Sequence, residues 1–337
     1  MKLHALQYMR AIASLAVVYS HAVLQVPAYQ AVLHDAGSFG VDIFFVISGF
    51  IMVYIARPGD TPVRFMTNRI RRVVPLYWFF TLLMAAILLI APSLFKTSAF
   101  DIPIIIKSLL FIPHYSQSDP SMVWPLVAPG WSLVYEMYFY LLFAASLWLP
   151  KRLRLVAIGL CIVCVFTAFW RLPVTGAVAD FFRDAIVFEF IFGMFLAWLY
   201  LRGVRMSSAL AWVLIAAGFT LLLWDPEINR LYKYGIPALM IVTGTVYCRI
   251  PDWSFFVLLG DSSYALYLVH IFTLGLCRKV LPPMLGEGLV AAVLFVLVSL
   301  ILCVITGLIT HYVIDNWLLR SGRREKLTGL RQRLAAG

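Results

Sequence analysis

Ten apolar segments, each long enough for a membrane-spanning helix, constrain the fold of this chain of 337 residues. They lie near residues 5–27, 38–56, 74–92, 129–149, 154–171, 181–201, 207–224, 231–249, 262–280 and 288–316. Because 63% of the residues are hydrophobic and only 13% are charged, a soluble domain could not bury this much apolar surface. The sequence therefore predicts an all-α polytopic membrane protein with about ten transmembrane helices.

The distribution of basic residues predicts the orientation of these helices. If the N-terminus is cytoplasmic, 19 of the 27 Lys and Arg residues fall in cytoplasmic segments, in agreement with the positive-inside rule. Both termini are then cytoplasmic. The net charge of +11 is therefore explained by basic residues that set the membrane topology and contact membrane lipids. We expect no nucleic-acid partner.

We expect one transmembrane domain over residues 1–319, followed by a basic cytoplasmic tail over 320–337 that lies on the inner leaflet. The segment 102–113 is apolar but short, bounded by prolines and interrupted by Lys107, so it is predicted to be re-entrant or interfacial. The five cysteines show no metal-ligand spacing and are interpreted as reduced packing residues, and no metal site is predicted.

The first apolar segment contains two ionisable residues, Arg10 and His21. They are eleven positions apart, which places them on one face of a helix and about 16–17 Å apart along its axis. Ionisable side chains inside a membrane are costly and usually mark a reaction or a transport pathway. Asp42 and Glu136 are predicted to lie at a similar depth in the outer half of the membrane, although Asp42 could instead cap its helix.

A cluster of arginines precedes the third apolar segment, in RFMTNRIRRVVP over residues 64–75. Arg69, Arg72 and Arg10 are expected at the same cytoplasmic level. Arginine side chains bind phosphate oxygens in a bidentate manner, so the cluster favours a polyphosphate ligand. The alternative is that these arginines only satisfy the positive-inside rule.

Five motifs in order make the chain resemble the membrane-bound acyltransferase-3 family, and its exopolysaccharide acetyltransferase branch in particular. They are Arg10 with His21 in LQYMRAIASLAVVYSH, Asp42 in GVDIFFVISGF, the pair Arg69 and Arg72, Glu136 in WSLVYEMYFY, and Tyr267 with His270 in SYALYLVH. The resemblance implies transfer of an acyl group, usually acetyl from acetyl-CoA, to a hydroxyl of a glycan or lipid-linked sugar. It also implies a multi-pass protein of the bacterial inner membrane.

The roles of these residues are expectations from the resemblance and from acid–base chemistry. His21 is expected to be the general base, because an imidazole with an ordinary pKa can activate a sugar hydroxyl, or else a nucleophile that carries the acyl group. Asp42 or Glu136 is expected to orient it. Arg10, Arg69 and Arg72 are expected to bind the phosphates of CoA, and Tyr267 and His270 to support the CoA channel.

Two other functions are compatible with buried ionisable residues. A proton-coupled transporter uses the same residue types, but the sequence has no two-half repeat of the kind found in many carriers. A scaffold in a polysaccharide export complex would leave these residues without a role. Binding of acetyl-CoA and release of free CoA would distinguish the enzyme from both.

Overall fold

The computed structural model describes residues 4–57, 59–94, 99–224, 227–248, 250–251, 253–315 and 317, and this part of the chain is helical without β-strands. Ten of its helices have twelve or more residues. They are α1 (His4–Val23), α3 (Gly40–Ile55), α4 (Pro62–Ile90), α6 (Trp131–Ser146), α7 (Lys151–Arg171), α9 (Phe188–Leu201), α10 (Ser208–Leu223), α11 (Ile236–Tyr247), α12 (Ser254–Val280) and α14 (Leu289–Thr310).

Shorter helical segments join or extend these ten helices. The short α-helices are α2 (Pro27–Gln30), α5 (Ile102–Leu109), α8 (Ala177–Arg183) and α13 (Pro282–Leu285). The 3₁₀ segments are η1 (Pro92–Leu94), η2 (Ala128–Gly130) and η3 (Ala185–Val187), and the π segments are η4 (Leu231–Gly235) and η5 (His311–Asp315).

Each of the ten predicted segments overlaps one of the ten long helices, which confirms the all-α prediction. By length and apolar composition, four of the described helices could cross a membrane: α4, α7, α12 and α14 with its π extension. The bent pair formed by α8 and η3–α9 could be a fifth span. The count of ten spans and the cytoplasmic location of both termini stay predictions, and the predicted tail 320–337 lies outside the described residues.

Two helices differ from the predicted segments for identifiable reasons. Helix α4 begins at Pro62, well before residue 74, because the Thr61 hydroxyl accepts a hydrogen bond from the Arg64 amide and proline fits the first turn. The arginine cluster is therefore helical. The predicted segment 181–201 is broken by a bend of 49° at Asp184, whose side chain caps η3. Helix α5 has eight residues, too short for an eleventh span.

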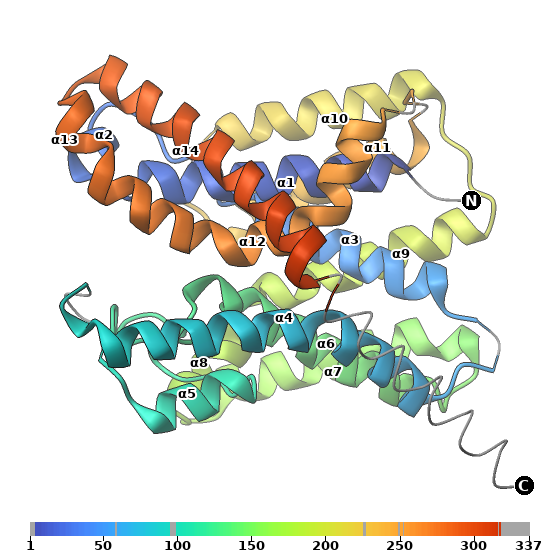
Figure 1. The fold of residues 1–337 in the computed structure, drawn as a ribbon. Coiled ribbons are helices and arrows are strands. Elements are labelled where there is room, and N and C mark those ends of the chain that lie inside the picture. The colour runs from blue at the N-terminus through green and yellow to red at the C-terminus, as the bar shows by residue number, and fades with distance from the viewer. Residues whose placement is uncertain are drawn as a thin grey trace, which may run out of the picture.

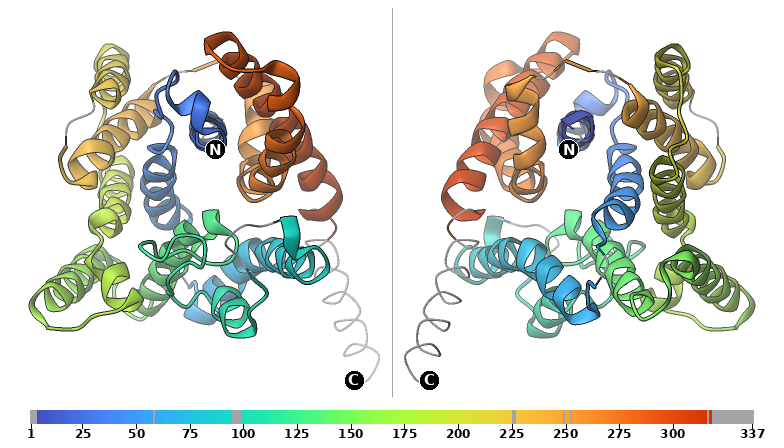
Figure 2. Two further views of the ribbon diagram at one scale, coloured as in Figure 1. Left: turned by 90° about the vertical axis from the view of Figure 1, so that its left-hand side faces the viewer. Right: turned by 90° about the vertical axis from the view of Figure 1, so that its right-hand side faces the viewer.

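Helix α1 lies inside the bundle, between α3 on one side and α12 with α14 on the other (Figures 1 and 2). Helices α4, α5, α6, α7 and α8 form the lower half of the molecule in Figure 1. Helix α12 contacts α4, and the Tyr264 hydroxyl donates a hydrogen bond of 2.6 Å to the Val73 carbonyl oxygen. Elements from both halves of the bundle therefore meet around α1 and α3.

Glycines allow α3 and α9 to cross closely. A Cβ added to Gly193 would lie 1.9 Å from the Val46 carbonyl oxygen, and one added to Gly49 would lie 2.1 Å from the Phe190 carbonyl oxygen. Small residues at a helix crossing are typical of membrane proteins. This contact holds α3, which carries Asp42 and Ser48, in a fixed position.

Candidate active site

A cavity of about 370 Å³ lies between α1, α3, α4, α6 and α12. Five of the eight predicted site residues line it: Arg10, Arg69, Arg72, Glu136 and Tyr267. The other polar lining residues are Gln7, Ser48, Ser132, Tyr140, Asp261, Ser263 and Tyr264. The fold therefore brings predicted residues from four of the five sequence motifs around one cavity. The remaining motif, GVDIFFVISGF, contributes Ser48.

Three guanidinium groups line the end of the cavity formed by the start of α1 and the first turns of α4. Arg10 donates a hydrogen bond of 3.1 Å to Gln7, and it lies close enough to Arg72 for their like charges to repel. The buried Nε of Arg69 has no hydrogen-bond partner within the described residues. An anion in the cavity would relieve the repulsion and bind this unused donor.

Glu136 is held at the wall of the cavity by two hydroxyl groups. Its Oε1 accepts a hydrogen bond of 2.8 Å from Ser48 on α3 and one of 2.5 Å from Tyr140, one turn further along α6. Gly49, the next residue of α3, packs against the backbone of α9. The Ser48 hydroxyl instead fixes the Glu136 carboxylate.

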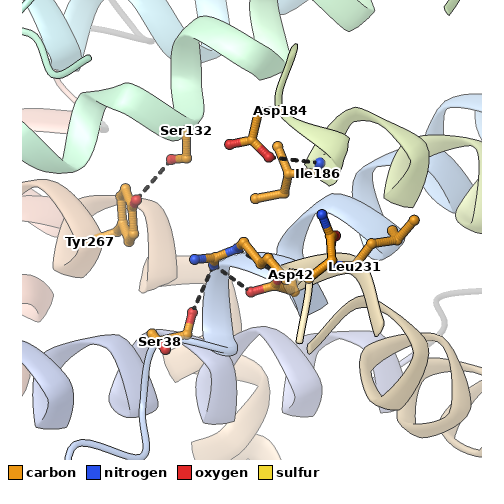
Figure 3. Close-up of polar contacts among 9 residues, drawn as sticks. Ser38, Asp42, Ser132, Asp184, Ile186, Leu231 and Tyr267 are labelled. Carbon is orange, nitrogen blue, oxygen red and sulfur yellow. Dashed lines mark hydrogen bonds and ion pairs between the residues drawn. The ribbon is translucent and has the colours of Figure 1, made fainter. Parts of the chain in front are cut away.

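Tyr267 lines the cavity from α12, and its hydroxyl is anchored to the start of α6. It donates to the Pro129 carbonyl oxygen at 2.9 Å and lies 2.8 Å from the Ser132 hydroxyl (Figure 3). The side chain is buried. A hydrogen-bonded and packed tyrosine of this kind gives the cavity a rigid wall.

His21 and His270 form a pair directly behind Tyr267. The His21 Nδ1 lies 2.6 Å from the His270 Nε2, although 249 residues separate the two in the chain. Their rings are nearly parallel, at 7°, with centroids 4.9 Å apart. The distance between the ring centroids is close to the sum of the N···N distance and the two distances from a ring centre to its nitrogen. The two nitrogens therefore lie on the line between the centroids, and the rings meet edge to edge in one plane and not face to face.

The hydrogen bonds around His270 determine which nitrogen of His21 is free. The His270 Nδ1 lies 2.7 Å from the Tyr267 carbonyl oxygen, which can only accept, so Nδ1 carries the proton. His270 is fully buried and contacts no carboxylate at hydrogen-bond distance within the described residues, which favours the neutral ring, with Nε2 as the acceptor. His21 then donates from Nδ1, and its Nε2 keeps the basic lone pair.

The two histidines are not among the described residues that line the cavity. They are nevertheless adjacent to it, because His270 lies one helical turn beyond Tyr267 and their ring centroids are 5.9 Å apart. The half-buried His21 comes from the same helix as Arg10. On the face of α1 between them, the buried Ser14 hydroxyl donates to its own helix, at the Ala11 carbonyl oxygen.

Asp42 forms an ion pair with Arg230, a residue that the sequence reasoning did not single out. Arg230 donates to both carboxylate oxygens, from Nη2 at 2.7 Å and from Nε at 3.1 Å, and also to the Ser38 carbonyl oxygen at 3.4 Å (Figure 3). Asp42 is fully buried, as is the nearby Glu189. The guanidinium also lies over the Trp131 ring, at 5.6 Å.

The carboxylates expected to orient His21 thus have other hydrogen-bond partners: Asp42 contacts Arg230, and Glu136 contacts Ser48 and Tyr140. The group within hydrogen-bond distance of the His21 ring is His270. Some of the overlooked residues lie inside the recognised motifs, such as Gln7, Ser132 and Tyr140. Arg230 had a weaker signal, as an arginine at the outer end of a predicted span.

Comparison with known families gives a match over most of the chain. The family model described as "Acyltransferase domain", that of acyltransferase-3, matches residues 3–308. The chain belongs to the acyltransferase-3 family. Membership supports acyltransferase activity over the transporter and scaffold alternatives.

Two curated relatives are similar over most of their length. The chain is 33% identical to the exopolysaccharide production protein ExoZ of Rhizobium meliloti (strain 1021) over 89% of this chain and 95% of the relative. It is 27% identical to the acyltransferase MdmB of Streptomyces mycarofaciens, over 87% of this chain and 84% of the relative. Among solved structures, no significant match is found.

Proposed function

We propose that this acyltransferase moves an acetyl group from acetyl-CoA across the bacterial inner membrane to a hydroxyl of a cell-surface or secreted polysaccharide. The observation that carries the proposal is the cavity with three arginines at one end and Tyr267, backed by the histidine pair, at its wall. The exopolysaccharide relative supports a glycan or lipid-linked sugar as the acceptor.

The arginine end of the cavity suits the phosphates of CoA. Arg10, Arg69 and Arg72 offer planar donor groups that match phosphate oxygens, and the buried Arg69 Nε provides an unused donor. The rest of the cavity is bounded by α3, α6 and α12, and its apolar side chains can surround the thin pantetheine arm. The thioester would then approach Ser132 and Tyr267, and the Tyr267 side chain would move aside for the thioester to meet His21.

His21 supplies the base in this proposal. Its Nε2 removes the proton of the sugar hydroxyl while the hydroxyl oxygen attacks the thioester carbonyl, and the departing CoA thiolate takes that proton as the carbon–sulfur bond breaks. The same lone pair could instead attack the thioester first, which breaks the carbon–sulfur bond, releases the CoA thiolate and gives an acetyl-histidine. The hydroxyl then takes the acetyl group, and its proton passes through His21 to the thiolate. In both routes His270 is a positioning residue, not a part of the CoA channel.

The test is O-acetylation of polysaccharide in a strain that lacks the gene, complemented with variants of matched membrane abundance. The wild type and His34→Ala, a control at an exposed histidine, should restore acetylation, whereas His21→Ala should not. Full acetylation with His21→Ala would contradict the mechanism. Purified protein should also release free CoA from acetyl-CoA in the presence of acceptor, which a carrier or scaffold would not do.

The arginine assignment has a separate kinetic signature. Arg69→Ala combined with Arg72→Ala should raise the KM for acetyl-CoA by roughly tenfold per arginine removed, because each loses a charge-assisted contact with phosphate. The turnover at saturating acetyl-CoA should change much less. An unchanged KM would show that these arginines only follow the positive-inside rule.

A further inference from the structure

A second cavity, of about 360 Å³, lies apart from the candidate active site. It is formed by the last turns of α3, α6 and α9 and by the first turn of α7, and a short loop joins α6 to α7 at this end of the bundle. Figure 2 shows these helix ends side by side in its right-hand view. The lining residues are Val53, Ala56, Phe143, Lys151, Arg152, Arg154, Leu155, Met194, Trp198, Leu201 and Arg202.

Four cations line this cavity, and none of its described lining residues is acidic. Arg154 donates to the carbonyl oxygens of Leu149 and Leu147, which holds its guanidinium at the end of α6. Arg202 lies over the Trp198 ring at 4.1 Å. Two of the four cations are therefore held in place at the edge of the cavity by contacts that leave their charge uncompensated.

The remaining lining is apolar. Phe143 and Met194 are almost fully buried between the helices, and Val53 and Leu155 are half-buried. A cationic edge above an apolar cavity matches an amphiphile with an anionic head and a hydrocarbon chain. A free phosphate would use the cations but not the apolar walls.

We propose that this cavity binds an anionic phospholipid of the cytoplasmic leaflet. The phosphate contacts Lys151, Arg152, Arg154 and Arg202, and one acyl chain lies along the apolar walls between α3, α6 and α9. The positive-inside rule accounts for basic residues at this end of the bundle. It does not account for an apolar cavity that four helices form directly beneath them.

The lipid would contact the candidate active site through a shared wall. In the last turns of α3, Met52 and Ile55 line the first cavity, whereas Val53 and Ala56 line the second. Occupation of the second cavity therefore supports the helix that carries Asp42 and Ser48. The lipid site itself uses none of the proposed catalytic residues and does not depend on the proposed reaction.

Binding can be measured by native mass spectrometry of the full chain in detergent, titrated with phosphatidylglycerol or with phosphatidylcholine of the same acyl chains. The wild type should bind phosphatidylglycerol more tightly. Arg152→Gln combined with Arg202→Gln should weaken its binding about thirtyfold, the loss expected for two cation–phosphate contacts. The control, Arg57→Gln with Arg205→Gln, removes two exposed cations that do not line the cavity and should change binding less than threefold.

Three results would overturn the proposal. An equal loss in the control variant would indicate general surface attraction, and equal binding of phosphatidylcholine would indicate a purely apolar groove. Competition by glycerol phosphate at the same concentration as the lipid would indicate a site for the anionic group alone. Unchanged thermal unfolding of both variants shows that neither result comes from misfolding.

Discussion

Replacement of His270 tests the histidine pair most directly. In His270→Leu the acceptor of the His21 Nδ1 proton is lost, and the Tyr267 carbonyl oxygen loses its donor. In His270→Gln the side-chain amide keeps an oxygen that can accept from His21. The two variants therefore differ in whether His21 remains held in the tautomer whose Nε2 is basic.

The expected size of the effect comes from the hydrogen bond that forms when His21 becomes protonated. A hydrogen bond to a charged group contributes about 1.5–3 kcal/mol. If this stabilisation is realised in the transition state, His270→Leu should lower kcat by roughly 10- to 150-fold. The KM for acetyl-CoA should stay near its wild-type value, because His270 is not among the described residues that line the cavity with Arg10, Arg69 and Arg72.

The assay is release of free CoA by purified protein as a function of acetyl-CoA concentration, with acceptor present. His270→Gln should recover most of the lost kcat, and His21→Ala with His270→Leu should be no slower than His21→Ala alone, since the two residues act as a unit. A kcat of wild-type size in a folded His270→Leu would refute the positioning role. A raised KM for acetyl-CoA with unchanged kcat would instead indicate that His270 supports the binding of acetyl-CoA.

Three further substitutions test other contacts through thermal unfolding in detergent. Arg230→Gln should lower the free energy of unfolding by about 3–5 kcal/mol, because the Asp42 carboxylate stays buried without its partner, and Asp42→Asn in the same chain should recover part of the loss. Gly193→Ala should cost about 1–3 kcal/mol through its clash across α3 and α9, whereas Gly159→Ala, where a Cβ meets nothing within 4 Å, should be neutral. Glu136→Leu should cost about 1–3 kcal/mol for each of the two hydroxyls left without an acceptor, and Glu136→Gln much less.

The sequence predicted the helices well because hydrophobicity in a membrane protein is a local signal. It missed the true start of α4, since the turns that carry Arg64 and Arg69 are polar and only the Thr61 cap marks them as helical. It also missed the bend at Asp184, where the chain stays apolar on both sides while the helix direction changes.

Five of the eight predicted site residues line one cavity, but the contacts of these residues were not predicted. Arg10, Arg69 and Arg72 were expected together at one end, and they line one cavity. The partners of the deeper residues depend on which helices become neighbours: Arg230 is 188 residues from Asp42, and His270 is 249 residues from His21. No periodicity in one sequence contains that information.

The position of the Tyr267 ring has a consequence for the energy supply of the cell. An enzyme that takes its donor from one side of a membrane and its acceptor from the other must not contain a continuous column of water, because protons would pass along it. The anchored ring lies between the arginine cavity and the histidine pair. In the proposed reaction, this ring would separate the cavity from the histidine pair except when an acyl group passes, and would so limit the leak of protons.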